Sequence, residues 1–163
     1  MKILIVSDSH RNNERIKDVL SIEGKPDMLI HCGDAEGGEY IISQMADCPM
    51  EIVSGNNDFF SNLPPEREFQ VLGKKFWLSH GHYYYVSLGT EKIIDEGKHR
   101  NADVVLFGHT HRPLVLEKDD MLIMNPGSVA YPRQEGRRGS YIVLEVSETG
   151  EMSAEVKYLP YSS

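Results

Sequence analysis

Short apolar runs that lead directly into metal-binding side chains are the feature that most constrains how this chain folds. The first run, residues 2–6, is continuous and rich in β-branched residues, which is typical of a strand buried on both faces. Most of the histidines follow these runs, together with aspartate and asparagine. Because open α/β sheets place their binding sites at the carboxyl ends of strands, we expect these side chains to converge at such an edge. The five segments are residues 6–10, 30–34, 53–58, 77–82 and 106–111.

The spacing within the segments favours convergence. In an extended segment residues i and i+2 point the same way, so Asp8 and His10 are expected to offer two side chains to one site. His109 and His111 have the same spacing. Glycine stands beside the polar residues in four of the five segments, where it permits tight turns and lets the backbone approach a ligand closely. These glycines are Gly33, Gly55, Gly81 and Gly108.

The pattern along the chain predicts an α/β protein without repeats or linkers. The first third alternates strands with helices and the second half is rich in strands. We therefore expect two sheets packed face to face with helices outside. Asn12 or Asn13 is expected to cap the first helix, and a hairpin is expected around Gly73. The expected strands cover residues 2–6, 27–32, 51–54, 66–72, 75–79, 104–107, 114–117, 121–124, 141–146 and 154–158. The first expected helix ends near Gly24 and Pro26, and the others cover 38–46 and the stretch between 87 and about 100.

Composition narrows the functional classes. The 163 residues suffice for one domain covering 1–163, and a net charge of −8 disfavours an extended nucleic-acid surface. A local phosphate site remains compatible with this charge if bound metals invert the charge of an acidic pocket. No apolar stretch reaches the ~20 residues of a membrane helix, and the N-terminus lacks a signal-peptide cleavage pattern. Cys32 and Cys48 have neither metal-ligand nor disulfide spacing, so we expect a cytoplasmic protein.

The polar residues of the five segments form a mixed set of carboxylate, imidazole and amide ligands. Such a set suits manganese, iron, zinc or nickel better than an all-oxygen calcium site or an all-thiolate zinc site. Two metals ~3.5–4 Å apart would clamp the attacking and leaving oxygens of a phosphoryl displacement, and a carboxylate such as Asp34 can bridge them. The alternatives are turn chemistry for Asp34, Asn56 and Asn57, and structural roles for the histidines.

Five short motifs follow one another along the chain. They are Asp8-x-His10, Gly33-Asp34, Gly55-Asn56-x-Asp58, His80-Gly81-His82 and Gly108-His109-x-His111. In this order they resemble the calcineurin-like metallophosphoesterase superfamily. The small size, the run Asn125-Pro126-Gly127-Ser128 and Arg133 resemble its compact YfcE-type branch, although the run can also be read as a plain turn. The resemblance implies an α/β, four-layer fold in which two packed mixed β-sheets are flanked by helices.

The resemblance also implies a set of seven side chains around two divalent ions, with attack on the phosphoester by a metal-bridging hydroxide. Manganese is the expected metal, and zinc, nickel and iron(II) are the alternatives. The set consists of Asp8, His10 and His111 on one ion, Asn56, His80 and His109 on the other, and Asp34 as the bridge.

One position departs from the family pattern. Many members have a histidine where this chain has Asn57, and an amide cannot act as a general acid. The expected substrate is therefore a small phosphodiester or an activated phosphomonoester. His82 is the expected substitute acid, and Asp58 is expected to orient a ligand. Substrate phosphate is expected to contact Arg11, Asn57 and Arg133.

Other functions stay open beside hydrolysis. The histidine pattern of metallo-β-lactamases is absent, and amidohydrolase barrels need roughly 250 residues. The rival from another class is a non-catalytic protein-interaction scaffold that resembles the retromer subunit, whose metal site is incomplete. Every metal-binding position of the family pattern is filled here, which favours catalysis. A homo-oligomer with an interface near residues 83–85 is a further expectation, His31 is expected in a strand, and His99 is expected to be solvated.

Overall fold

The computed structural model describes residues 1–161, in which ten strands form two five-stranded sheets. The first sheet comprises β1 (Lys2–Val6), β2 (Met28–His31), β3 (Met50–Ile52), β9 (Ser140–Val146) and β10 (Met152–Tyr158). Its strand order is β10-β9-β1-β2-β3. The parallel strands β1, β2 and β3 are extended at one edge by the antiparallel pair β9 and β10, so this sheet is mixed.

The second sheet comprises β4 (Glu66–Val71), β5 (Lys74–Ser79), β6 (Val104–Leu106), β7 (Pro113–Lys118) and β8 (Met121–Pro126). Its strand order is β4-β5-β6-β8-β7. The three central strands are parallel to one another, and both edge strands are antiparallel to their neighbours. The β4–β5 hairpin turns at Gly73, as the sequence predicts.

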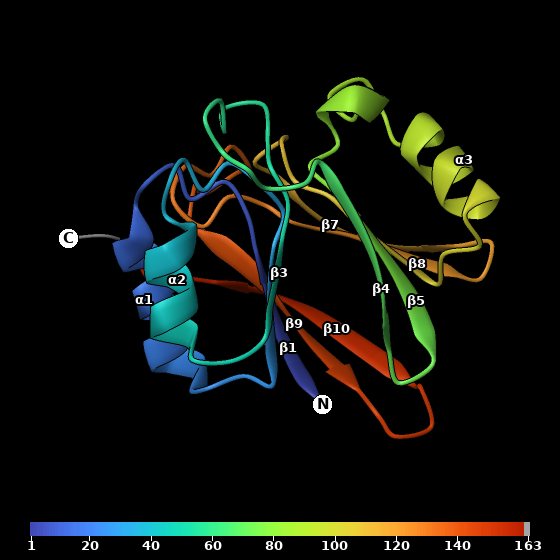
Figure 1. Cartoon of the computed structure of the whole chain (residues 1–163), viewed down its shortest axis with the longest axis horizontal. Coiled ribbons are helices and arrows are strands. Elements are labelled where there is room, and N and C mark those ends of the chain that lie inside the picture. Colours follow the sequence, from blue (N-terminus) through green and yellow to red (C-terminus); the bar gives the residue numbers. More distant parts are fainter. Residues whose placement is uncertain (162–163) are drawn as a thin grey trace.

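Helices cover the outer faces of both sheets (Figure 1). α1 (Asn13–Glu23) and α2 (Glu39–Ala46) lie on the first sheet, and α3 (Glu91–His99) lies on the second. The buried side of α1 is formed by Ile16 and Val19, which pack in one cluster with Leu4 of β1. Among residues 1–161, none of the helices is both long enough and apolar enough to cross a membrane.

β1 illustrates why an uninterrupted apolar run is needed in the first sheet. Ile3 and Ile5 join the core cluster between the sheets, whereas Leu4 and Val6 join the cluster under the helices. All four side chains are 0% exposed. Because successive side chains of a strand point to opposite faces, both faces of β1 must be apolar. The prediction of a strand buried on both faces is confirmed.

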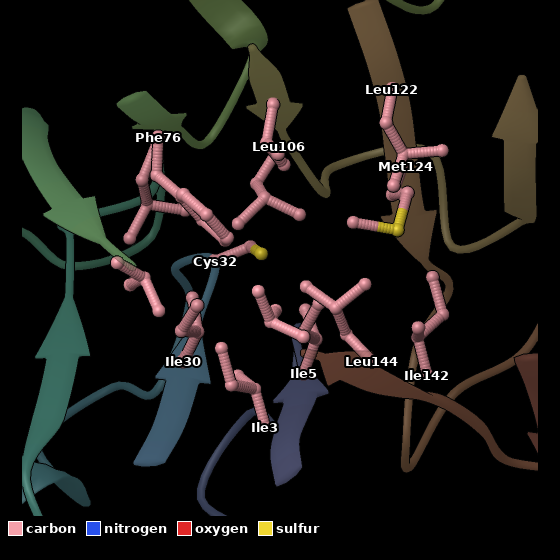
Figure 2. Packing of buried hydrophobic residues seen from close by; sticks show 14 of the residues in the cluster. Ile3, Ile5, Ile30, Cys32, Phe76, Leu106, Leu122, Met124, Ile142 and Leu144 are labelled. Carbon is pink, nitrogen blue, oxygen red and sulfur yellow. The ribbon is translucent and has the colours of Figure 1, made fainter. Parts of the chain in front are cut away.

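The core between the sheets contains side chains from both (Figure 2). Phe76, Leu106 and Met124 of the second sheet meet Ile5 and Leu144 of the first. With helices outside each sheet, this gives the predicted four-layer α/β arrangement. The apolar core holds the two sheets in fixed relation, so loops at their carboxyl ends have fixed relative positions.

Two local predictions are wrong. The helix predicted from residue 87 begins only at Glu91, because Gly89 has a φ of 150°, outside the helical region. The chain before it forms a short 3₁₀ turn, η1 (His82–Tyr84). Asn12 stands at the N-cap of α1, but its side chain makes no capping hydrogen bond. The other predicted boundaries agree with the structure to within one or two residues.

Candidate metal centre

Loops that follow strands of both sheets meet at one end of the molecule. The backbone N–H of Asp8 donates to the carbonyl of Gly33 at 3.0 Å, which ties the loop after β1 to the loop after β2. The N–H of Gly108 donates to the carbonyl of His80 at 3.0 Å and ties the loops after β6 and β5. The N–H of His109 donates to the Asp8 carboxylate at 3.1 Å, which links the two sheets.

Most of the predicted ligands lie on backbone in the left-handed region. A non-glycine residue there costs roughly 1–2 kcal/mol, so such residues persist only where the surrounding structure imposes them. The expectation that Asp8 and His10 share a direction through an extended backbone is therefore wrong, because the chain turns tightly at both. The residues with this backbone are Asp8, His10, Asp34, His109 and His111, with φ values from 46° to 72°.

One group of potential ligands surrounds the Oδ1 atom of Asp8. Nε2 of His111 lies 3.2 Å from this atom, and Nε2 of His10 lies 3.8 Å from it. The two Nε2 atoms are themselves 3.2 Å apart. Asp8 is 0% exposed and His111 6%. These three side chains are close enough to share a single ion.

A second group shares Asp8 and adds Asp34 and His80. Nε2 of His80 lies 3.4 Å from Oδ2 of Asp34 and 3.7 Å from Oδ1 of Asp8. Oδ2 of Asp34 also lies 3.8 Å from Nε2 of His10. Each of the two carboxylates therefore reaches histidines of both groups, and either Asp8 or Asp34 could be shared between two ions if both groups held one.

Asn56 and His109 complete the cluster. Oδ1 of Asn56 lies 3.1 Å from Nδ1 of His109, and the His109 ring centroid lies 5.2 Å from that of His80. The structure thus brings all the predicted ligand positions, from five separate loops, to one place.

Hydrogen bonds fix how the histidines present their nitrogens. Nδ1 of His80 lies 2.7 Å from the carbonyl oxygen of Cys32, and Nδ1 of His111 lies 2.7 Å from that of Tyr131. A carbonyl only accepts, so Nδ1 carries a proton in both rings and Nε2 is the nitrogen turned to the centre. Nε2 of His80 and Oδ1 of Asp8 are buried without any hydrogen-bond partner in the described structure. Converging imidazole nitrogens and carboxylate oxygens, two of them without a hydrogen-bond partner, fit a divalent metal ion.

Gly33 and Gly55 allow the ligands to lie directly against the backbone. A Cβ atom at Gly33 would stand 2.5 Å from Nδ1 of His80. A Cβ atom at Gly55 would stand 2.7 Å from Cγ of Asp34. Both distances are too short for a contact between non-bonded atoms. The side chain next to each glycine therefore leaves no room for a Cβ atom there.

Both buried carboxylates are held in the ionised form. Burial by itself raises the pKa of Asp34, but His80 and Asn57 outweigh it and leave the pKa below its ordinary value. The same opposition, with His111 and His80 as the main lowering groups, leaves the pKa of Asp8 lowered. Two adjacent carboxylates that stay ionised form an anionic pocket for cations.

Asn57 and Asp58 support the ligand loops. The backbone N–H and side-chain amide of Asn57 donate to the carboxylate of Asp34 at 2.9 and 3.0 Å. The carboxylate of Asp58 accepts the backbone N–H groups of Asp34 at 2.8 Å, Glu36 at 2.7 Å and Gly55 at 2.7 Å. Asn57 therefore orients Asp34, and Asp58 joins the loop after β2 to the loop after β3.

Glu36 is a functional candidate that sequence reasoning missed. Its Oε2 atom lies 3.0 Å from Nδ1 of His10, so the Nε2 atom of His10 is turned to the centre. A carboxylate behind a histidine ligand fixes the ring orientation and raises its basicity. The sequence offers only one signal for this role, an acidic residue two positions after Asp34.

We expect Glu36→Gln to weaken metal binding by about 10–100-fold, the usual effect of removing such a supporting carboxylate. The affinity of the metal-free protein for Mn²⁺, measured by competition with a chelator, checks this. Glu39→Gln is the matched control, because the Glu39 carboxylate near the same loop contacts no ligand histidine. Equal affinities for Glu36→Gln and the wild type would remove the assigned role.

His31 lies in β2 beneath the centre and is 0% exposed. Its Nδ1 accepts the backbone N–H of Gly33 at 3.1 Å, and its Nε2 lies 2.9 Å from the hydroxyl of Ser9. Nδ1 is therefore the unprotonated nitrogen and His31 is neutral. Burial lowers its pKa from 6.5 to about 4. The prediction that His31 is a strand residue is confirmed, and exposed His99 lies near the end of α3 as predicted.

His31 is expected to make the metal-free protein less stable as pH falls from about 6.5 to about 4. In that window the unfolded chain binds a proton at His31 and the folded protein does not, so the free energy of unfolding decreases, by up to about 3 kcal/mol. Urea unfolding with EDTA at several pH values measures this. His31→Gln should reduce the pH dependence and His99→Gln should preserve it. An unchanged slope in His31→Gln would contradict the account.

His82, the expected acid, lies at the rim of the centre. Its ring centroid is 5.4 Å from that of His80 and 4.1 Å from that of Tyr83. Burial, followed by the nearby His80 and His109, lowers the pKa of His82, so its imidazole is neutral at pH 7. Tyr83 and Tyr85 are exposed, whereas Tyr84 turns inward and its hydroxyl donates to Glu66.

The two predicted phosphate-binding arginines lie in separate hollows beside the centre. Arg11 lines a hollow of about 310 Å³ together with Asn57 and Phe59. Arg133 lines a hollow of about 560 Å³ together with His10 and His111. Both arginines are exposed, and neither side chain makes a hydrogen bond or ion pair within residues 1–161.

Asn125 and Ser128, in the run 125–128, form hydrogen bonds with the loops that carry the predicted ligands. The amide of Asn125 donates to the carbonyl of Gly108 at 3.1 Å and to the hydroxyl of Thr110 at 2.9 Å. The hydroxyl of Ser128 donates to the carbonyl of Asp8 at 2.8 Å. Both side chains are buried, which supports the structural interpretation of this run.

Solved structures support the fold. A mutant form of Vps29 from Entamoeba histolytica superimposes with a TM-score of 0.79 at 20% identity, covering 98% of this chain and all of the other. Wild-type Vps29 of the same organism was solved in complex with Zn²⁺. The predicted arrangement of two mixed sheets flanked by helices is confirmed.

Residues 1–149 match the family profile of the calcineurin-like phosphoesterase superfamily domain. The probable metallophosphoesterase YsnB of Bacillus subtilis is 32% identical over 145 residues, which cover 88% of this chain and 83% of YsnB. The phosphodiesterase YfcE of Escherichia coli is 27% identical over 172 residues, which cover 89% of this chain and 88% of YfcE. This chain therefore belongs to the calcineurin-like phosphoesterase superfamily, in its compact YfcE-type branch.

Proposed function

We propose that the chain is a binuclear metal-dependent phosphoesterase that hydrolyses a small phosphodiester, or a phosphomonoester with a good leaving group. The observation that carries the proposal is the pair of buried, ionised carboxylates, Asp8 and Asp34, faced by the unpartnered Nε2 of His80. Ionised carboxylates packed this closely need cations to be stable. Relatives named as phosphodiesterases support the choice of reaction.

The donor set divides naturally between two ions. Mn²⁺ is the metal we propose, because mixed oxygen and nitrogen ligands suit it, and Zn²⁺, Ni²⁺ and Fe²⁺ are the alternatives. When bound, the ions supply charge neutralisation at the phosphate and an acidified water as nucleophile. The proposed ligands are Asp8, His10 and His111 for one ion, Asn56, His80 and His109 for the other, and Asp34 shared between them.

The remaining polar groups determine which leaving groups are tolerated. Asn57 cannot give up a proton, and both its backbone and side-chain donors are used by Asp34. His82 is neutral at pH 7 because its pKa is lowered. Neither residue is therefore a strong acid at this pH, and we infer that the substrate has a leaving group that departs with little protonation.

Purified protein loaded with Mn²⁺ and assayed with bis-p-nitrophenyl phosphate and p-nitrophenyl phosphate tests the proposal. We expect two bound metals per chain, and a faster reaction with the diester. Asn56→Ala and His80→Ala should lose both metal and hydrolysis, whereas His99→Ala, at an exposed position of α3, should keep both. Full metal loading without turnover of either compound would disprove the enzyme assignment.

A second candidate is a non-catalytic scaffold of the Vps29 kind. The likeness to Vps29 covers 98% of this chain, and a Vps29 has been solved with bound Zn²⁺, so a metal-loaded site of this fold is compatible with that role. Metal binding without hydrolysis in the assay above is the result that would favour it.

A further inference from the structure

The arginines of this chain fall into two sets. Arg15, Arg67 and Arg100 form ion pairs, and Arg138 donates to backbone carbonyls. The side chains of the others make no hydrogen bond or ion pair among residues 1–161. These others are Arg11, Arg112, Arg133 and Arg137, and all of them flank the loops of the candidate metal centre. In a protein with a net charge of −8, carboxylates are available to pair with arginines. Four unpaired arginines around one site therefore indicate that this site binds an anion.

Two of the adjoining hollows have arginines and no carboxylate in their lining. We call the one that His10 and His111 also line the arginine hollow. It has a volume of about 560 Å³ and no carboxylate in its lining, which consists of His10, His111, Tyr131, Pro132, Arg133 and Arg137. The hollow that contains Arg11 is different, because Glu36, Glu39 and Asp58 also line it. An anionic group beside the centre is therefore attracted to the arginine hollow and is repelled by the carboxylates in the hollow of Arg11.

The arginine hollow is joined to the metal centre. His111 donates from Nδ1 to the carbonyl of Tyr131 at 2.7 Å, and the backbone N–H of Arg133 donates to the carbonyl of His111 at 3.0 Å. The Tyr131 ring packs edge-on against the ring of His10, with centroids 5.5 Å apart. The same two histidines thus face the candidate metal centre on one side and the arginine hollow on the other.

The loop that presents the second arginine is anchored at several points. The N–H of Arg137 donates to the carbonyl of Gln134 at 3.1 Å, and the side chain of Gln134 donates to the carbonyl of Arg138 at 2.6 Å. Arg138 in turn donates to the carbonyl of Leu159 at 2.9 Å. The backbone of Arg137 is therefore fixed beside the hollow.

We propose that the arginine hollow binds a second phosphate of the substrate, so that the substrate is a nucleotide diester with a further phosphate on one arm. This inference rests on the proposed function. Ions held at the candidate centre would neutralise the scissile phosphate, which would leave Arg133 and Arg137 for a different anion. Guanidinium groups bind phosphate through paired, charge-assisted hydrogen bonds. Tyr131, 50% exposed, offers a ring on which a planar base stacks.

Two compounds that differ by one phosphate test the proposal: thymidine 3′-(p-nitrophenyl phosphate), and the same diester with a phosphate on its 5′-hydroxyl. With Mn²⁺-loaded wild type we expect kcat/KM to be about tenfold or more higher for the phosphorylated diester, mainly through KM, since one charge-assisted contact gives about that factor. Arg133→Met and Arg137→Met should each reduce this preference. Lys118→Met removes an exposed cation at the far end of β7 and should keep it.

Equal kcat/KM for the two diesters in the wild type would overturn the inference, as would a preference that survives both arginine variants. Hydrolysis of the unphosphorylated diester shows separately whether the proposed function holds. Calorimetric titration with thymidine 3′-monophosphate and thymidine 3′,5′-bisphosphate gives a readout that needs no turnover. Tighter binding of the bisphosphate that is lost in Arg137→Met supports the arginine hollow even if neither diester is hydrolysed. Equal binding of the two nucleotides argues against it.

Discussion

Asp8→Asn is expected to reduce hydrolysis of bis-p-nitrophenyl phosphate by at least about 1,000-fold, because stabilisation by metal ions is worth several kcal/mol. Oδ1 of Asp8 lies within 3.2 Å of His111, 3.7 Å of His80 and 3.8 Å of His10. Asp8 is also the residue shared by both groups of potential ligands. Asparagine has nearly the same shape but carries no charge, so the change removes the charge that both groups share.

Metal content decides why activity is lost in Asp8→Asn. We expect the bound metal to fall from two ions per chain to one or none, measured by elemental analysis after dialysis. Asp95→Asn, at an exposed position of α3, is the control for loss of a carboxylate and should keep both ions. Circular dichroism shows that the variant is folded. A folded Asp8→Asn protein with two ions and wild-type turnover would contradict the central position given to Asp8.

The layered fold follows from local patterns in the sequence. An apolar run such as 2–6 has only one stable environment, a strand covered on both faces, and the structure has that arrangement. The start of α3 was harder to predict, because residues 87–90 carry no strong helix-breaking signal except Gly89. The direction of Tyr84 depended on Glu66, which lies on a different strand.

The ligand positions were visible in the sequence because the motifs place metal-binding residue types in a fixed order. Their backbone geometry was not visible. Asp8 adopts its left-handed backbone with its N–H bound to Gly33, which is remote in sequence. Glu36 and Arg137 were missed for the same reason, since their importance comes from what lies beside them in space. A charged residue in a loop is normally solvated, and only the contact with His10 or the shared hollow with Arg133 distinguishes these two.

Asp58→Asn is expected to lower the free energy of unfolding of the metal-free protein by about 2–4 kcal/mol. The carboxylate accepts backbone N–H groups through both oxygens: Oδ2 from Asp34 and Gly55, and Oδ1 from Glu36. Asparagine keeps one oxygen, and its NH₂ group then faces at least one N–H donor without an acceptor. Urea unfolding in EDTA measures the loss. Because two ligand loops separate when these bonds break, we also expect Mn²⁺ affinity to fall about 10–100-fold.

Asp103→Asn separates the loss of stability from the effect on the metal. Asp103 also accepts a backbone N–H, from Lys75 at 2.8 Å, but it lies before β6 at the opposite end from the ligand loops. Asp103→Asn should lower the free energy of unfolding and leave Mn²⁺ affinity unchanged. A role for Asp58 in proton transfer would give the reverse pattern: wild-type stability and metal affinity, with an altered pH dependence of kcat. That pattern would show that Asp58 acts on the substrate. If Asp58 acts through its three backbone contacts, Asp58→Asn must lose stability and metal affinity together.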